Sequence, residues 1–507
     1  MAASASFIEE IYSDIQRAAK QVSLERLDHH PPLIVFECLT DASEVLSAAA
    51  LARLQAGGRA VTETLTMPRR GFGPRPVEVL SPVSRTVYTS LVEHLSDSIP
   101  PPSRGGSSWA EHETFGLDGA HSYVVEMDFA SCYELIEHED LTQELLLRSY
   151  DHETVTALIS LLRGVGRRGR GLPQMLHASD RLADTYLDII DRRLRRKGRS
   201  LHRYADDIRV LADDWDRANE VIEETGAYAR ELGLILSSEK TSIRLRRTLA
   251  EDIDHHRRIR DEFFKNHANA VLESQQGPYH EPDQIYSDAY DAATGGAFIR
   301  FLTQWHEDFA DRDSASIERS RFTTMSGLIP AALAALSNAP EPLEEALLAD
   351  LVFQDPTRLE FVSNYVLGHL SGPHADHDFA SSVIDNLTSM GRQGSWSKLW
   401  LLRVTTQLSG PSRQTARWMH QQLLSTSEVV RAEAAWACAT HGLLRSDELQ
   451  GCYSSASELS MPGLSAAASR QSVAASDRGS SLSPDILAAI EEDSPLNRKA
   501  AQWAKQS

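Results

Sequence analysis

The sequence lacks several features that mark secreted and membrane proteins. Cysteine is scarce, and the four cysteines lie far apart with no pair at metal-ligand spacing: Cys38, Cys132, Cys438 and Cys452. This distribution argues against a disulfide framework and against a paired-cysteine zinc site. No apolar run approaches the roughly 20 residues that a membrane span requires. The N-terminal residues are acidic where a signal peptide would be basic and then apolar. We therefore expect a cytoplasmic protein without a membrane partner.

Positive charge is also in deficit across the whole chain. The 51 Lys and Arg are outnumbered by 72 Asp and Glu, so the formal net charge is −21. Residues 163–203 are the exception, because twelve Lys and Arg face only four Asp there. A basic segment within an acidic chain indicates an anionic partner, although a solvated basic helix is the alternative interpretation.

Hydrophobic patterning divides the chain into regions of different character. A chain of 507 residues is too long for one compact core, so two or three domains are expected. Residues 1–60 have helical spacing, and residues 61–80 alternate around a Gly/Pro centre, which predicts a β-hairpin. Residues 121–250 mix strands and helices, and an irregular α-helical array is predicted beyond them. Residues 454–484 are rich in Ser, Ala and Gly, which fits either a mobile linker or small-residue helices.

Two acidic patterns carry the strongest chemical signal. Tyr204, Ala205, Asp206 and Asp207 lie between β-type segments, which predicts a hairpin turn with two adjacent carboxylates. Asp128 ends an apolar strand, where a charge costs several kcal/mol unless it is paired or binds a metal ion. Clustered carboxylate oxygens are the ligands that Mg²⁺ prefers, with water and phosphate completing its coordination. Asp128, Asp206 and Asp207 are therefore candidate catalytic and metal-ligating residues.

A glycine-rich turn and a long helix lie between these acidic patterns. Residues 169–174 read GRGLPQ, whose glycines allow the backbone to approach a nucleotide closely. The helix that follows gathers apolar residues on one face. Its acidic residues are expected largely off that face: Asp180, Asp184, Asp188 and Asp191.

Taken in order, these patterns resemble the palm of reverse transcriptases over residues 61–250. The resemblance rests on four motifs in the palm: DFASCY at 128–133, GLPQ at 171–174, YADD at 204–207 and GLILSSEKT at 233–241. Upstream, RRGFGPR at 69–75 resembles the fingers hairpin, and SPVSRTVY at 81–88 resembles the fingers motif that follows it. Four ordered motifs at sensible spacing are a specific signal.

The resemblance implies an α+β fold, with right-hand polymerase fingers and a palm of antiparallel sheet and helices, followed by an all-α, helical-repeat-like domain. The implied domains are an N-terminal helical segment at 1–60, fingers at 61–120, the palm at 121–250, a helical repeat-like domain replacing the thumb at 251–453, and a small-residue-rich region with a C-terminal helix at 454–507.

The resemblance also implies roles for individual residues. Asp128 and Asp206 would ligate two Mg²⁺ ions, with Asp207 beside them and Mn²⁺ as an alternative metal. Tyr133 would be the steric gate that excludes a 2′-hydroxyl and so selects dNTPs. The other expected substrate-binding residues are Phe129, Gln174 at the template or nascent base pair, Lys240 near the pyrophosphate, and Arg69, Arg70 and Arg75 at the triphosphate.

Two further expectations concern arginines and lysines outside these motifs. The basic run would lie near the backbone of the template or product: Arg192, Arg193, Arg195, Arg196 and Lys197. Arg85 would either position backbone or pair with an acid of the palm. One departure from the family pattern is Met175, because many members carry glycine directly after the glutamine.

A helical array in place of a thumb resembles the defence-associated, abortive-infection reverse transcriptases of the unknown groups. The resemblance implies antiphage DNA synthesis, with an RNA template or an associated non-coding RNA, a DNA product and a homo-oligomeric assembly. One alternative is a template-independent nucleotidyltransferase primed on a tyrosine or serine of the protein itself. Another is an inactive palm whose helical array binds protein or RNA. A palm-fold nucleotide cyclase would not explain GLPQ or the fingers hairpin.

Overall fold

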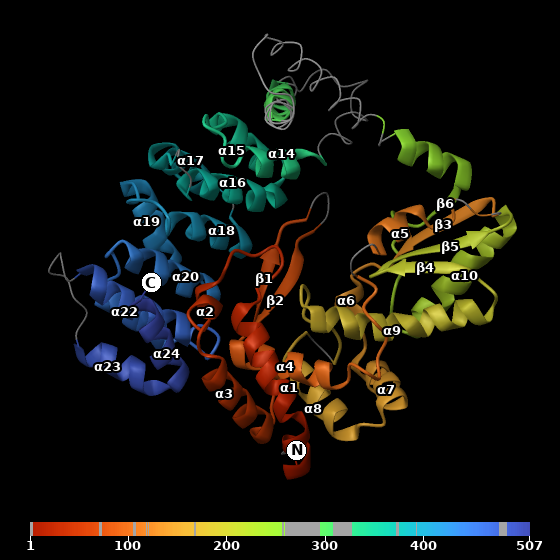
Figure 1. Cartoon of the computed structure of the whole chain (residues 1–507), viewed down its shortest axis with the longest axis horizontal. Coiled ribbons are helices and arrows are strands. Elements are labelled where there is room, and N and C mark those ends of the chain that lie inside the picture. Colours follow the sequence, from red (N-terminus) through yellow and green to blue (C-terminus); the bar gives the residue numbers. More distant parts are fainter. Residues whose placement is uncertain are drawn as a thin grey trace, which may run out of the picture. The chain divides into compact units, whose positions relative to one another are not determined.

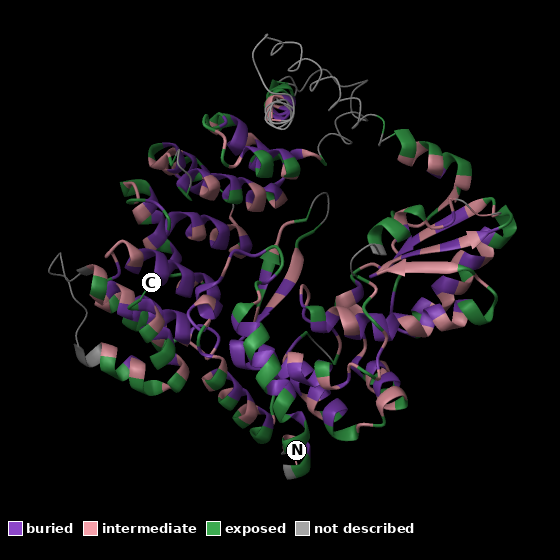
Figure 2. Ribbon diagram, viewed as in Figure 1, coloured by how far each residue is buried: buried purple, intermediate pink, exposed green. Residues whose placement is uncertain are grey.

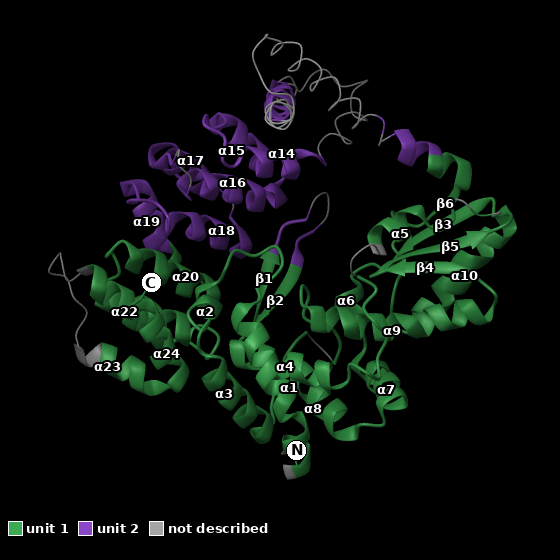
Figure 3. Cartoon of the chain, in the orientation of Figure 1, with its two compact units in different colours: residues 1–66, 76–250, 422–507 green, residues 67–75, 251–421 purple. Residues whose placement is uncertain are grey.

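The computed structural model of the chain describes most residues: 4–69, 73–104, 108–117, 119, 121–166, 169–255, 258, 295–307, 327–371, 375–391, 393–475 and 484–506. The chain forms two compact units (Figure 3). The first unit combines residues 1–66, 76–250 and 422–507, and the second combines residues 67–75 and 251–421.

Helices and a hairpin open the first unit. The helices are α1 (Ala5–Leu24), α2 (Ile34–Glu37), α3 (Ser43–Ala56) and α4 (Pro82–His94). α1 packs against α3 and α4, and its apolar spacing puts Ile11 and Ile15 fully inside the core. β1 (Thr62–Met67) and β2 (Arg75–Leu80) pair with each other. The helical N-terminal region and the β-hairpin predicted from the sequence are both confirmed.

An antiparallel sheet of four strands forms the centre of the palm region (Figure 1). Its strands are β3 (Tyr123–Asp128), β4 (Leu201–Tyr204), β5 (Asp207–Ala212) and β6 (Ser242–Leu245), in the order β4-β5-β3-β6. α9 (His177–Arg196) packs against β4, and α10 (Trp215–Glu231) packs against β3 and β5. Alternate residues of β5, Ile208 and Val210, are buried, as the two-residue period of a half-covered strand requires.

Shorter helices connect these parts of the first unit. They are α5 (Ser108–Thr114), α6 (Cys132–Leu135), α7 (His138–Ser149) and α8 (His152–Leu162). α8 packs against α4 and α7, and α7 packs against α9. α4, which follows β2 in the chain, packs against α8 and α9, and most of its residues are buried. Figure 2 colours the buried residues of these helices purple.

The C-terminal helices belong to this same first unit. They are α20 (Glu428–Thr440), α21 (Ser446–Ser454), α22 (Met461–Ala475), α23 (Pro484–Asp493) and α24 (Pro495–Ala504). α22 packs against α2, α20 and α24. Of the two interpretations left open for the small-residue segment, the described part up to residue 475 therefore favours helices. Residues 422–507 belong to the first unit, because α20 and α22 pack against α2.

The second unit is helical in its described residues from 295 onward. Its named helices are α14 (Ile329–Leu336), α15 (Glu345–Gln354), α16 (Leu359–Ser371), α17 (His377–Ser389), α18 (Ser395–Thr405) and α19 (Arg413–Gln422), with a 3-10 turn at Pro356–Arg358. α16 packs against α14, α17 and α18, so consecutive helices stack in overlapping groups. The mixed sheet-and-helix fold with a helical C-terminal region confirms the predicted fold class. Among the described residues, none of the helices combines the length and apolar composition that crossing a membrane requires.

Candidate active site

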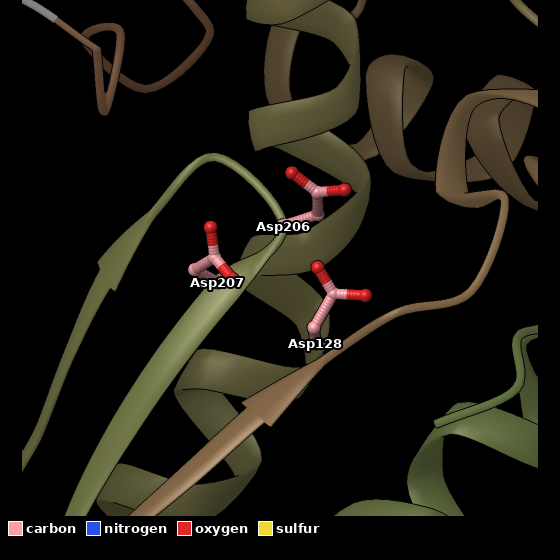
Figure 4. A group of neighbouring side chains, drawn as sticks. All are labelled: Asp128, Asp206 and Asp207. Carbon is pink, nitrogen blue, oxygen red and sulfur yellow. The ribbon is translucent and has the colours of Figure 1, made fainter. Parts of the chain in front are cut away.

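Three carboxylates converge at one end of the four-stranded sheet (Figure 4). Asp128 is the last residue of β3 and Asp207 is the first residue of β5, and the two face each other across the antiparallel ladder. Asp206 belongs to the turn that precedes β5. One carboxylate oxygen from each residue lies within 4.8 Å of the others. The structure thus brings together the three aspartates that the sequence predicted to share a site.

Burial and mutual repulsion raise the pKa values of two of these acids, Asp128 and Asp207. Asp128 is 4% exposed, and burial raises the pKa of its carboxyl group despite the hydrogen bond that it accepts from Lys240. Burial, followed by the charge of Asp206, raises the pKa of Asp207 to about 6. Carboxylates this close repel one another unless a cation or a proton lies between them. Three hard oxygen ligands on one side of a sheet are a donor set that fits a divalent cation.

The turn that carries Asp206 contains two residues, Ala205 and Asp206. Ala205 has a φ of 55°, which is the positive φ that tight hairpin turns need to match the twist of their strands. This conformation costs about 1 kcal/mol in a residue with a Cβ atom. The Ala205 N–H donates to Ser103 Oγ at 2.9 Å, and its carbonyl accepts from Arg203 Nη1 at 2.9 Å. Two side chains therefore hold the turn in this conformation.

Lys240 lies beside the carboxylates because its segment runs along the end of β3. The N–H of Ala130 donates to the carbonyl of Ile235 at 2.8 Å, and the N–H of Ser237 donates to that of Asp128 at 2.8 Å. The Lys240 ammonium then reaches Asp128, with Nζ 2.5 Å from Oδ2. The fourth motif thus brings a cation to a cluster of anions.

Tyr133, the expected steric gate, is fixed at its side chain and at its backbone. Its hydroxyl donates to Asp180 Oδ1 on α9. Arg104 lies beside the same acid, with Nη1 3.6 Å from Oδ1. The Tyr133 carbonyl accepts from the N–H of Leu172 at 2.8 Å, which joins α6 to the GLPQ segment. The first and second motifs are therefore packed as one assembly.

The residue after Gln174 adopts the conformation that glycine favours. Met175 has a φ of 64°, so the left-handed backbone is present although the usual glycine is not. The Gln174 side chain is half-buried. The backbone N–H of Gln174 donates a hydrogen bond to the carboxyl group of Glu78 on β2. Burial raises the pKa of Glu78 to about 7, although this hydrogen bond partly opposes the rise. The GLPQ segment thus lies against the second strand of the hairpin.

The structure places Phe129 and the arginines of the hairpin as follows. Phe129 is 1% exposed, so its side chain packs in the core, and a contact with a nucleotide would have to come from its backbone. The reason is strand geometry, because the alternation that directs Asp128 to one face directs its neighbour to the other. Arg69 and Arg75 lie on either side of the hairpin tip, and Arg70 lies outside the described residues.

Arg85 pairs with a partner other than the palm acid that the sequence suggested. Its Nη2 lies 2.5 Å from Oε2 of Glu25, the residue that caps the end of α1. The Arg85 side chain is buried and also lies over the ring of Phe36. Arg85 therefore joins the fingers helix α4 to the N-terminal helices.

The basic run at the end of α9 is matched by acids of the first unit. Arg192 pairs with Glu144 and Asp188, and Arg195 pairs with Asp188. Arg193 pairs with Glu231, and Lys197 pairs with Glu224. The described contact of Arg196 is a hydrogen bond from Nε to the carbonyl of Arg192. These contacts tie α9 to α7 and α10, and they offset much of the local positive charge.

A buried polar group on α9 was missed by sequence reasoning. Asp184 and Asp191 are 2% and 3% exposed, although their spacing predicted positions off the apolar face. Arg203 of β4 lies between them, with Nη1 on Asp184 and Nε 2.9 Å from Asp191 Oδ2. Their seven-residue separation on one helix, followed by an arginine directly before YADD, is the signal that could have suggested this arrangement.

Geometry of this kind, an antiparallel sheet with two helices against it and three carboxylates at its end, defines a polymerase-type palm. Residues 69–277 match the family model described as "Reverse transcriptase (RNA-dependent DNA polymerase)". The chain therefore carries a reverse transcriptase domain, and this match supports an RNA-directed DNA polymerase.

Comparison with solved structures finds a telomerase from Candida albicans, described in complex with a TWJ fragment of telomeric RNA. The identity is 11% and the TM-score is 0.28, and the alignment covers 66% of this chain and 67% of that chain. No curated protein matches the chain in sequence.

Proposed function

We propose that the protein synthesises DNA by adding dNTPs to a growing 3′ end on an RNA template. The observation that carries the proposal is the convergence of Asp128, Asp206 and Asp207 at one end of the sheet. The match to the reverse transcriptase family over residues 69–277 supports the same reaction.

In this proposal, the three aspartates hold two Mg²⁺ ions, with Mn²⁺ as a substitute. Bound ions of this kind lower the pKa of an attacking 3′-hydroxyl and offset the charge on the leaving pyrophosphate. Asp128 is the best-placed ligand, because its burial makes an uncompensated charge costly. Lys240, already in contact with Asp128, would turn toward the pyrophosphate when metal occupies the carboxylates.

The neighbouring residues would select and align the nucleotide. Tyr133, held by Asp180, would block the space that a 2′-hydroxyl needs. Gln174 would contact the template or the nascent base pair, and Arg69, Arg70 and Arg75 at the hairpin tip would bind the triphosphate. A role for the basic run at 192–197 in binding nucleic-acid backbone requires exchange of its acidic partners for phosphates. That binding would be strongly salt-dependent.

We further propose that this synthesis serves defence against bacteriophage, with an associated non-coding RNA and a homo-oligomeric assembly. The support is the resemblance to defence-associated reverse transcriptases, together with the series of α-helices that the described residues form between 329 and 422. Sequencing the nucleic acid that co-purifies with the protein tests the RNA, the template and the product together.

Asp206→Ala tests the polymerase directly. Labelled dNTP incorporation on an RNA template with a DNA primer and Mg²⁺ should fall at least about 1,000-fold, because the variant loses a ligand that the reaction needs. Asp213→Ala is the matched control, since Asp213 is an acid with a 76% exposed side chain, paired with His121, just beyond the other end of β5. Its rate should stay within about twofold of the unmodified protein. An Asp206→Ala protein that incorporates dNTPs at the normal rate would refute the proposal.

Each alternative predicts a different experimental result. DNA that forms without added template and stays covalently attached to the protein would favour the protein-primed nucleotidyltransferase. Phage protection that is unchanged in Asp206→Ala would favour the scaffold with an inactive palm.

A further inference from the structure

The turn that carries Asp206 is linked by hydrogen bonds to a buried acid on α9, Asp184, which is not one of the three carboxylates of the site. Ala205, the first residue of the turn, is buried and has a positive φ of 55°. A strained conformation of this kind persists only where its surroundings hold it. The side chains that contact Ala205 therefore set the direction in which the next residue, Asp206, leaves the turn.

The N–H and the carbonyl of Ala205 are each connected to Asp184 of α9 through one intervening side chain. On the N–H side, Ser103 Oγ accepts from Ala205 at 2.9 Å and donates to Asp184 Oδ1 at 2.7 Å. The Ser103 N–H also donates to Asp184 Oδ2 at 2.7 Å. On the carbonyl side, Arg203 Nη1 donates to Ala205 O at 2.9 Å and also to Asp184 Oδ1.

Asp184 and Arg203 are buried, and the Asp184 carboxylate acts only as an acceptor for the donors around it. The side chains of Asp184 and Arg203 are 3% and 7% exposed, so water offers little substitute for either partner. Donors surround the Asp184 carboxylate, and an amide in its place would turn an NH₂ group toward one of them. Asp184 stands on a long helix packed against the sheet, which makes it a rigid anchor for the turn.

We propose that Asp184 is a positioning residue for the metal site. It holds Ala205 through Ser103 on one side and Arg203 on the other, and so keeps Asp206 directed toward Asp128 and Asp207. The inference deepens the proposed function, because it names what builds the site in which the reaction takes place. A displacement of about 1 Å at a ligand is enough to weaken a metal site of this kind.

Asp191 supplies a matched control within the same buried group. It binds Arg203 through Nε at 2.9 Å, whereas the links to Ala205 run through Nη1 and Ser103. Asp191→Asn therefore disturbs a buried ion pair of Arg203 without removing either link to the turn. Ser103→Ala removes only the hydroxyl bridge, and Ser103→Thr restores a hydroxyl at the same position.

The test measures Mn²⁺ binding to the full chain by electron paramagnetic resonance, alongside the kinetics of dNTP incorporation. We expect Asp184→Asn to weaken Mn²⁺ binding about tenfold or more, and Ser103→Ala about three- to tenfold, because each lost link leaves the turn freer. Asp191→Asn and Ser103→Thr should stay within about twofold. In the first two variants kcat should fall while KM for dNTP stays constant, and a higher Mg²⁺ concentration should restore part of the rate.

Unchanged Mn²⁺ affinity in Ser103→Ala and Asp184→Asn would overturn the proposal. Equal losses in Asp191→Asn and Asp184→Asn would also overturn it, because the effect would then belong to the buried charges in general. Thermal unfolding identifies a variant that fails to fold, and the Ser103 pair decides the question if Asp184→Asn is such a variant. If the unmodified protein binds Mn²⁺ but incorporates no dNTP, the proposed function fails and the Mn²⁺ measurements still decide the positioning role.

Discussion

Met175 shows how one residue can depart from a family pattern while its backbone does not. It follows Gln174, where many reverse transcriptases carry glycine, and its φ of 64° is in the left-handed region. An L-residue pays a steric penalty of about 1 kcal/mol there, and a β-branched residue is less tolerated still. The segment after Gln174 therefore keeps the left-handed backbone that glycine favours, although the residue there is methionine.

At Met175, substitution by glycine should therefore destabilise the protein less than substitution by valine. We expect Met175→Gly to change the free energy of unfolding by no more than about 0.5 kcal/mol, because relief of strain offsets the entropy of glycine in the unfolded chain. Met175→Val should cost about 1–2 kcal/mol. Urea unfolding followed by circular dichroism measures both. A glycine variant that loses more stability than the valine variant would show that φ at this position is not strained.

The sequence was sufficient for some residues of the site and not for others. Asp128 and Asp206 could be predicted, because a charge at the end of an apolar strand is costly unless it is paired or binds metal, and because the acidic turn occurs in order with the other palm motifs. The burial of Asp184 was not predicted, since it depends on an ion pair with Arg203, which comes from the strand β4. Periodicity assigns a polar residue to the surface unless its partner is known.

At the scale of elements, α22 shows how small residues build a close helix packing. Ser465 and Ser469 lie one turn apart and donate across to the carbonyls of Asn497 and Ala501 on α24, at 2.8 and 3.0 Å. Both serines are almost fully buried. Short side chains allow the two helices to approach closely enough for these hydroxyls to reach the backbone of the partner helix.

A larger side chain in this contact should force the helices apart. We expect Ser469→Leu to lower the free energy of unfolding by about 1–3 kcal/mol through overpacking. Ser469→Ala should cost about 1 kcal/mol, the net value of one hydrogen bond. Val473, one turn further on and 46% exposed, is the control, and Val473→Ala should stay within about 0.5 kcal/mol. A neutral Ser469→Leu in thermal or urea unfolding would contradict the close packing.

Element types were easier to predict than their assignment to units. Helical and alternating patterns are local, so the hairpin, the strand that ends at Asp128 and the C-terminal helices could all be predicted. The Ser- and Ala-rich segment was ambiguous, because its composition fits a linker as well as a buried helix. In the part that the structure describes, up to residue 475, packing against α20 and α24 favours a helix, and no local pattern identifies those neighbours.

At the scale of the whole molecule, the first unit is assembled from segments far apart in the chain. Glu433 on α20 accepts from the N–H of Ile34 at the start of α2, at 2.5 Å. Glu458 accepts from Ser81 Oγ at 2.6 Å and pairs with Arg53. The C-terminal helices thus complete the core beneath the fingers, and the residues that match the reverse transcriptase family do not form that core alone.

A chain that ends at residue 421 should therefore lose its activity although it keeps every residue of the candidate site. The truncation uncovers Ile34 and Val35, which are fully buried and lie close to Gly463 of α22. Each exposed side chain of this kind costs about 1.5–3 kcal/mol, against a total stability of about 5–15 kcal/mol for a typical domain. We expect the 1–421 chain to be insoluble or to melt without cooperativity, and to incorporate no dNTP. Circular dichroism melting and the incorporation assay, each run beside the full chain, measure the two effects. A 1–421 chain that melts cooperatively and polymerises at the full rate would show that residues 422–507 are an independent addition to a self-sufficient polymerase.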